Sequence, residues 1–108
     1  YAGNFPVWLA PVQIIVLPIS KDCNEYAWEV YRKLFDEDLR VELDDSSERI
    51  SYKIRAAEVR KIPYMVIVGT REVEAGTISV RRHGIGDLGQ MTLSDFIKNL
   101  RNDIKNKK

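Results

Sequence analysis

The most constraining feature of the sequence is an uncharged run of seven residues, from Pro63 to Gly69. A strand without charged side chains on either face is typical of a sheet that is covered on both sides. Pro63 can only begin such a strand, because it has no N–H for the ladder. The run therefore predicts a central strand. Arg71 and Glu72 stand just past its carboxyl end, where open α/β sheets hold ligands.

Two further strands are predicted upstream of this run. Val12 to Leu17 is nearly continuous in β-branched residues and suits a second buried strand, whereas Arg40 to Asp44 alternates and suits an edge. Between them, Asp22 with Glu25 three residues later favours the start of an amphipathic helix. The apolar face of this helix consists of Ala27, Val30, Tyr31 and Leu34.

A second helix is predicted from Glu48 to about Lys61, with Ser46 or Ser47 as its cap. Its apolar stripe consists of Ile50, Ile54 and Ala57. A separate basic stripe, roughly 100° away, consists of Arg49, Lys53 and Arg60. A stripe of one sign without acidic partners can be a solvated surface or a phosphate-binding face, and the pattern leaves both open.

The C-terminal third predicts one more strand and a closing helix. Glu74 to Gly76 turns the chain, and Thr77 to Arg82 alternates, which places Arg81 on the polar face of its strand. Thr92 or Ser94 is expected to cap the helix. The apolar face of the helix consists of Leu93, Phe96, Ile97, Leu100 and Ile104.

The order of these elements predicts an α/β fold. Right-handed crossovers make the first three strands parallel, in the order 2-1-3, with helices on opposite faces and an antiparallel hairpin added. Three polar segments then meet at the carboxyl edge of the sheet, namely Lys21, 46–49 and 69–72. This edge is the expected binding edge.

Composition excludes several classes of protein. A chain of 108 residues forms one domain, and its formal charge of +1 names no partner. Cys23 is the only cysteine, which rules out an internal disulfide and a cysteine cluster for zinc. No apolar run is long enough to span a membrane, so a cytoplasmic protein without membrane contact is expected. The chain begins at Tyr1 without an initiator methionine, which suggests an excised piece of a longer protein.

Two motifs are weighed as catalytic or cofactor sites. Gly84 to Gly89 spells G-x-G-x-x-G, but no helix follows at once and no strand follows that helix, so a turn is favoured over a dinucleotide site. His83 is the only histidine, and no nucleophile or carboxylate pair is placed for it to activate. No catalytic or metal-binding set is expected in this chain.

Nucleic acid suits the remaining polar residues better. The fork of Arg81 matches guanine edges and phosphates, and the carboxylate of Glu72 can accept from base amino or imino groups. Unpaired bases of RNA loops are recognised in this way.

An ordered set of fragments resembles the C-terminal anticodon-binding domain of threonyl-tRNA synthetase, a class II aminoacyl-tRNA synthetase. The resemblance covers nearly the whole chain from Phe5 onward. The fragments are Phe5-Pro6-x-Trp8-Leu9-Ala10-Pro11-Val12-Gln13, Tyr52-Lys53-Ile54-Arg55, Ile62-Pro63-Tyr64, Val68-Gly69-x-x-Glu72-Val73-Glu74 and Val80-Arg81.

The resemblance implies a mixed five-stranded sheet with three helices. Residues 1–11 would be a linker from an absent upstream catalytic domain, and 12–108 the anticodon-binding domain. The parent enzyme would attach threonine to its tRNA using ATP. Its ATP, Mg and Zn sites and its homodimer contacts would lie in the absent domains, so this fragment would hold no cofactor.

The resemblance also assigns the RNA-binding residues. The domain would grip the anticodon loop of threonine tRNA and recognise chiefly its second and third bases, with Arg81 on guanine and Glu72 as a further anticodon contact. Ser47 stands where the family has Asn, and Arg49 where it has Lys, so the amide contact is lost and the charge is kept. Supporting phosphate contacts are expected from Lys53, Arg71 and Arg82.

Several alternatives stay open at this point. The chain could be the equivalent domain of a prolyl, histidyl or glycyl synthetase, a free-standing adaptor for tRNA or protein, or a small nucleotide-dependent enzyme. The relative placement of Glu72 and Arg81 is a further question. A plain hairpin after Gly69 would carry Arg81 back down its strand, whereas a bent connection over 71–76 would keep both on one surface, as the resemblance implies.

Overall fold

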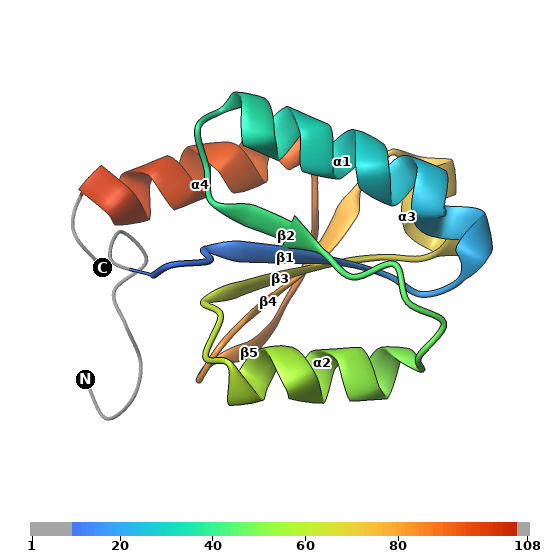
Figure 1. The fold of residues 1–108 in the computed structure, drawn as a ribbon. Helices are drawn as coiled ribbons and strands as arrows, with labels where there is room; N and C mark the ends of the chain where they lie inside the picture. The colour runs from blue at the N-terminus through green and yellow to red at the C-terminus, as the bar shows by residue number, and fades with distance from the viewer. Residues whose placement is uncertain (1–9, 106–108) are drawn as a thin grey trace.

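A five-stranded mixed sheet forms the centre of the computed structural model, which describes residues 10–105 (Figure 1). The strands lie in the order β2-β1-β3-β4-β5. Their bounds are β1 Ile14–Pro18, β2 Val41–Leu43, β3 Tyr64–Val68, β4 Ile78–Arg82 and β5 Gly86–Met91. Strands β2, β1 and β3 are parallel, and β4 and β5 continue the sheet antiparallel to their neighbours. The α/β class, the 2-1-3 order and the added hairpin are therefore confirmed. The expected linker lies almost wholly outside the described residues.

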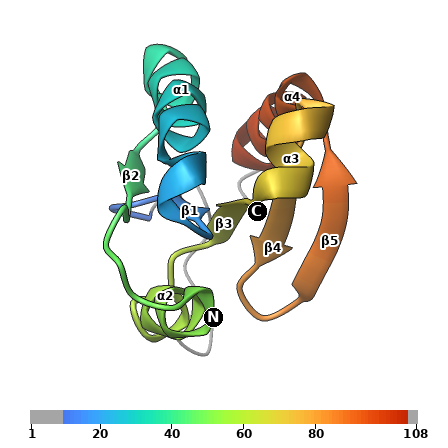
Figure 2. The same ribbon diagram turned by 90° about the vertical axis from the view of Figure 1, so that its right-hand side faces the viewer.

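Four α-helices and one short 3-10 turn cover the sheet. The helices are α1 Asn24–Asp36, α2 Ile50–Val59, α3 Thr70–Ala75 and α4 Leu93–Lys105, and the turn η2 is Lys21–Cys23. Helices α1, α3 and α4 lie on one side of the sheet, and α2 alone lies on the other (Figures 1 and 2). The resemblance implied three helices, and 71–76 was expected to be a connection. Helix α3 fills that connection and is too short to show a helical apolar period. Gly76, at φ 69°, ends it.

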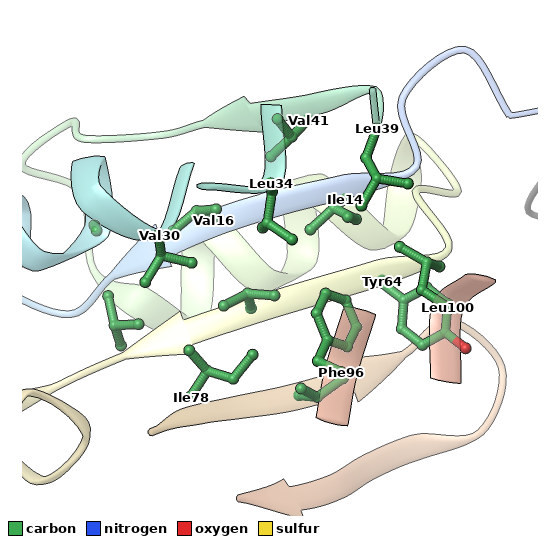
Figure 3. Packing of buried hydrophobic residues seen from close by; sticks show 14 of the residues in the cluster. Ile14, Val16, Val30, Leu34, Leu39, Val41, Tyr64, Ile78, Phe96 and Leu100 are labelled. Atoms are coloured by element: carbon green, nitrogen blue, oxygen red, sulfur yellow. The ribbon is translucent and has the colours of Figure 1, made fainter. Parts of the chain in front are cut away.

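Two layers of apolar side chains pack against the sheet. The larger layer lies between the sheet and helices α1 and α4, and Figure 3 shows its side chains meeting from the strands and from both helices. It contains the predicted helix positions Ala27, Val30, Leu34, Phe96 and Leu100. The smaller layer joins β1 and β3 to α2 through Ile15, Leu17, Ala57, Ile62 and Met65. Both faces of β1 and β3 are thus covered, as their uncharged sequences predicted.

The predicted caps of the first two helices are wrong. Asp22 lies inside the 3-10 turn, and α1 starts at Asn24 without a side-chain cap. Helix α2 starts at Ile50, later than expected, and neither Ser46 nor Ser47 caps it. The loop is ordered instead by Asp44, whose Oδ1 accepts from the N–H of Ser46 at 3.0 Å. The final cap is confirmed, since Thr92 Oγ1 accepts from the Asp95 N–H at 3.2 Å.

The three predicted loops do meet at the carboxyl edge of the parallel strands. The N–H of Ile19 donates to the carbonyl of Val68 at 2.9 Å, which joins the first and third loops. Lys53, only 3% exposed, reaches the same edge from α2. Its Nζ donates to the carbonyls of Pro18 at 3.0 Å and Asp44 at 3.2 Å, which joins the first and second loops.

The glycine-rich segment forms the β4–β5 hairpin and the first part of β5. Gly84, Gly86 and Gly89 all have positive φ, a conformation that disfavours other residues. The pairing shifts between Val80 and Arg81, which face Gly89 and Asp87, so that Leu88 is an extra residue in a β-bulge. The turn predicted over Gly84 to Gly89 is confined to residues 83–85, and the rest of the segment belongs to β5. No helix within residues 10–105 is long and apolar enough to cross a membrane.

Candidate functional site

The face of β4 and β5 on the side of α2 is polar and carries no helix. Ile78 and Val80 point into the core on the other side, so Ser79 and Arg81 point to the side of α2. Helix α2 lies beneath β1 and β3 and does not extend beneath β4 and β5 (Figure 2). We call this surface the bare face. It is formed by Ser79, Arg81 and their cross-strand partners Gln90 and Asp87.

Arg81 is held on the bare face with donors to spare. Its side chain is 32% exposed, and Nη2 lies 3.9 Å from Oε1 of Glu58 on α2. That distance is at the limit of an ion pair and contributes little. Nε is buried and lacks a hydrogen-bond partner among the described residues. A buried donor without a partner costs free energy, whereas the exposed part of the side chain can meet acceptors on a ligand.

Glu72 is not a free carboxylate. It is 6% exposed, in the first turn of α3. Its Oε1 accepts from the N–H of Gly69 at 2.8 Å, and its Oε2 accepts from Nε2 of Gln90 at 2.7 Å. Gly69 permits this approach, because a Cβ there would lie 2.6 Å from Cδ1 of Ile19 and 3.2 Å from Oε1 of Glu72. The expectation that Glu72 projects openly toward bases therefore needs correction: both oxygens already accept hydrogen bonds within the protein.

Glu72 and Arg81 nevertheless belong to one surface. Gln90, which donates to Glu72, pairs with Ser79, and Ser79 shares a face with Arg81. Along the sheet they are separated, because Arg81 pairs with Met65 near the start of β3 whereas Glu72 follows its end. At about 3.3 Å per residue, the offset from Met65 to the strand end is about 10 Å. Arg81 is therefore carried down its strand, away from the carboxyl edge, and Gln90 links the carboxylate of Glu72 to the face that carries Arg81.

Three expected contact residues lie exposed at the carboxyl edge. Ser47 and Arg49 belong to the loop that leads into α2, and Arg71 lies in the first turn of α3. No ion pair or side-chain hydrogen bond is formed by Arg49 or Arg71 within the described part of the chain. Their charges are therefore available at the carboxyl edge of the sheet.

Two residues expected to contact phosphate are engaged elsewhere. The ammonium of Lys53 is buried and donates to two carbonyls, so Lys53 joins loops and does not form an exposed basic stripe with Arg49. Arg82 lies on the face opposite to Arg81. Its guanidinium stacks 5.0 Å above the Tyr64 ring centroid and donates to the Tyr64 hydroxyl at 2.7 Å. Arg60, the third member of the predicted stripe, forms a bidentate pair with Glu42 at 3.0 Å and 3.1 Å.

Sequence patterns missed part of this surface. Gln90 and Asp87 were not predicted, because the glycine-rich pattern of this segment indicated a turn and not the strand β5. Arg55 could have been found: it lies one turn before Glu58 on α2, is exposed, and belongs to one of the fragments that carry the resemblance.

Burial, and then the charges of Glu29 and Glu72, raise the pKa of Tyr26, whose hydroxyl donates to the Thr77 carbonyl at 2.8 Å behind the site.

No cluster of three His, Cys, Asp or Glu side chains within residues 10–105 is arranged to hold a metal ion. A surface of arginines, amides and a carboxylate can form hydrogen bonds with the edges of bases and with phosphates. Comparison with known proteins also points to binding of nucleic acid. The model of the anticodon binding domain family matches residues 13–103. The chain belongs to this family.

The matches to relatives of this anticodon-binding domain cover its full length or nearly so. It is 50% identical over 108 residues to a threonine–tRNA ligase of Carboxydothermus hydrogenoformans, covering 100% of this chain and 17% of the relative. It is 55% identical over 107 residues to that of Caldanaerobacter subterraneus subsp. tengcongensis, covering 99% of this chain and again 17% of the relative. The chain thus spans about a sixth of the length of these curated relatives.

The fold also matches a solved structure. The RNA binding domain of threonyl-tRNA synthetase from Cryptosporidium parvum Iowa II superposes with a TM-score of 0.89 at 32% identity. The match covers 94% of this chain and 26% of that chain. The anticodon-binding domain described here therefore shares both its sequence and its architecture with the threonine enzymes, which favours them over the prolyl, histidyl and glycyl alternatives.

Proposed function

We propose that this domain recognises the anticodon loop of a threonine tRNA on its bare face, as part of a threonine–tRNA ligase. Arg81 carries the proposal. Its side chain is 32% exposed on a surface without a covering helix, and its ion pair with Glu58 is long, at 3.9 Å, which leaves the guanidinium able to bind a ligand. A bidentate Arg is the commonest specific contact to a guanine edge. Arg81 would therefore read one base of the loop.

The remaining charges fit a role in holding the backbone. Arg49 and Arg71 stand exposed at the carboxyl edge, which lies about 10 Å from Arg81 when measured along the strands, so they would contact backbone phosphates of the same loop. Arg55 lies beside Glu58 and can do the same from α2. Ser47 would contribute at most one hydroxyl contact.

The parent enzyme would supply the chemistry. Because the relatives are about six times longer than this chain, aminoacylation with ATP, the Mg and Zn sites and the homodimer contacts would belong to other parts of the protein. A cytoplasmic location follows from this proposed role in translation. The domain described here would supply selection of the tRNA.

Binding of the 108-residue chain to anticodon stem-loops tests the proposal. Affinities are compared for a matched loop and for loops with each base replaced in turn, at a fixed salt concentration. We expect Arg81→Ala to lose about 1–3 kcal/mol of discrimination at one base, as the loss of one bidentate contact should. Arg32→Ala, an exposed arginine on α1, is the control. Equal discrimination by the wild type and Arg81→Ala would contradict the assignment.

A further inference from the structure

We infer that Gln90 is a second base-reading residue, held in one orientation by the buried carboxylate of Glu72. The inference rests on the proposed function, because it concerns which bases the bare face selects. Gln90 is exposed on β5, and its side-chain Nε2 donates a hydrogen bond to Oε2 of Glu72 at 2.7 Å. It lies across from Ser79, on the same face as Arg81.

The carboxylate leaves the amide one orientation. An ionised Glu only accepts hydrogen bonds, so the amino end of Gln90 must face Glu72 and the carbonyl end must face away. Glu72 cannot turn to relax this choice, because its other oxygen accepts from the N–H of Gly69 at 2.8 Å and its side chain is 6% exposed. A glutamine that is free in solvent rotates and presents either end.

A fixed amide can distinguish two classes of base. Uracil and guanine present an N–H beside a carbonyl on the pairing edge, whereas cytosine and adenine present a ring nitrogen beside an amino group, in the reverse order. The free carbonyl and the second N–H of Gln90 form one acceptor–donor pair in one order. For a base held by its backbone, this order matches one class only. Gln90 therefore separates the keto bases from the amino bases at one position of the loop.

The position should differ from the one that Arg81 reads. Ser79, opposite Gln90, is two residues from Arg81 along β4, so the two side chains are separated by about 7 Å or more along the face. Two groups at that spacing reach different bases of a splayed loop. The two residues together would account for the reading of two bases.

The test measures affinities of the 108-residue chain for stem-loops that carry each of the four bases at each anticodon position. Gln90→Ala should lower the preference between keto and amino bases about tenfold at one position, and Arg81→Ala should do so at another. Glu72→Gln supplies donors to Gln90 and lets its amide reverse, so the preference at the same position should weaken or invert. Asn99→Ala, an exposed amide on α4, should change nothing.

A second measurement does not depend on the folding of any variant. The side-chain amide signals of Gln90 in the wild-type chain, assigned by their absence in Gln90→Ala, should shift when the matched stem-loop is added. Unchanged amide signals at saturation would overturn the inference, as would unchanged base preferences in Gln90→Ala. If Arg81→Ala still loses discrimination in that case, the proposed function stands and only the role of Gln90 fails.

Discussion

The two halves of the sheet follow different rules. The parallel half, β2-β1-β3, lies between α1 on one face and α2 on the other, and its inner strands are apolar on both faces. The antiparallel half, β4 and β5, is covered by α4 on one face only and alternates apolar with polar residues. Burial on two faces stabilises a domain but presents no side chain to a ligand. The half covered on one face gives up part of that burial, and the residues it exposes are the ones that can bind.

The largest expected contrast is in stability. Leu17→Ala removes a side chain that is 0% exposed between β1 and α2, and should lower the free energy of unfolding by about 3 kcal/mol. Ser79→Ala, on the bare face, should change it by less than about 0.5 kcal/mol. Urea denaturation of both variants measures the difference. Similar losses in the two variants would show that both halves contribute alike.

Lys53 sharpens the comparison, because its charge serves the covered half. Lys53→Met keeps the apolar stem and leaves the Pro18 and Asp44 carbonyls without their donor, so we expect a loss of about 2 kcal/mol in stability. Lys33→Met, on the exposed surface of α1, is the matched control and should be nearly neutral. The salt dependence of RNA binding should be the same in both variants. A flatter salt dependence in Lys53→Met alone would contradict this and would show that Lys53 contacts a phosphate.

Arg49 should show the reverse behaviour. Arg49→Ala should leave the unfolding transition in place and reduce the slope of log K against log salt by about 0.7, the value for one phosphate contact to a single strand. The loss of affinity should be equal for matched and mismatched stem-loops. A change in base preference would mean that Arg49 reads a base.

The smallest expected effect concerns the link between the halves. Tyr26 on α1 donates to the Thr77 carbonyl just before β4, and burial is the main cause that raises its pKa above the ordinary 10.0. A raised pKa favours the protonated phenol in the folded state. The contribution of the protonated Tyr26 hydroxyl to the free energy of unfolding is therefore complete below pH 10.0. It is lost as the pH rises through the folded pKa. Above pH 10.0 the midpoint temperature of thermal unfolding should fall with pH less steeply in Tyr26→Phe than in the wild type.

The covered half could be predicted from the sequence and the bare half only in part. Uncharged runs such as 63–69 indicate strands that are buried on both faces. This pattern identified the central strands and allowed their order to be predicted. Burial of charged groups is not visible in a pattern: Lys53 and Glu72 were expected at the surface because Lys and Glu usually lie there. Their positions depend on carbonyls and an amide supplied by distant segments. Arg81 was placed correctly, because strand alternation alone determines its face.

The β-bulge at Leu88 has a consequence for changes in chain length. Deleting Leu88 would leave Val80 opposite Gly89 and Arg81 opposite Asp87 in a regular ladder, so every polar side chain would keep its face. Loss of one residue from the regular pairs on either side would instead turn part of the strand over. A hairpin that is shorter by this one residue is therefore compatible with the same polar surface.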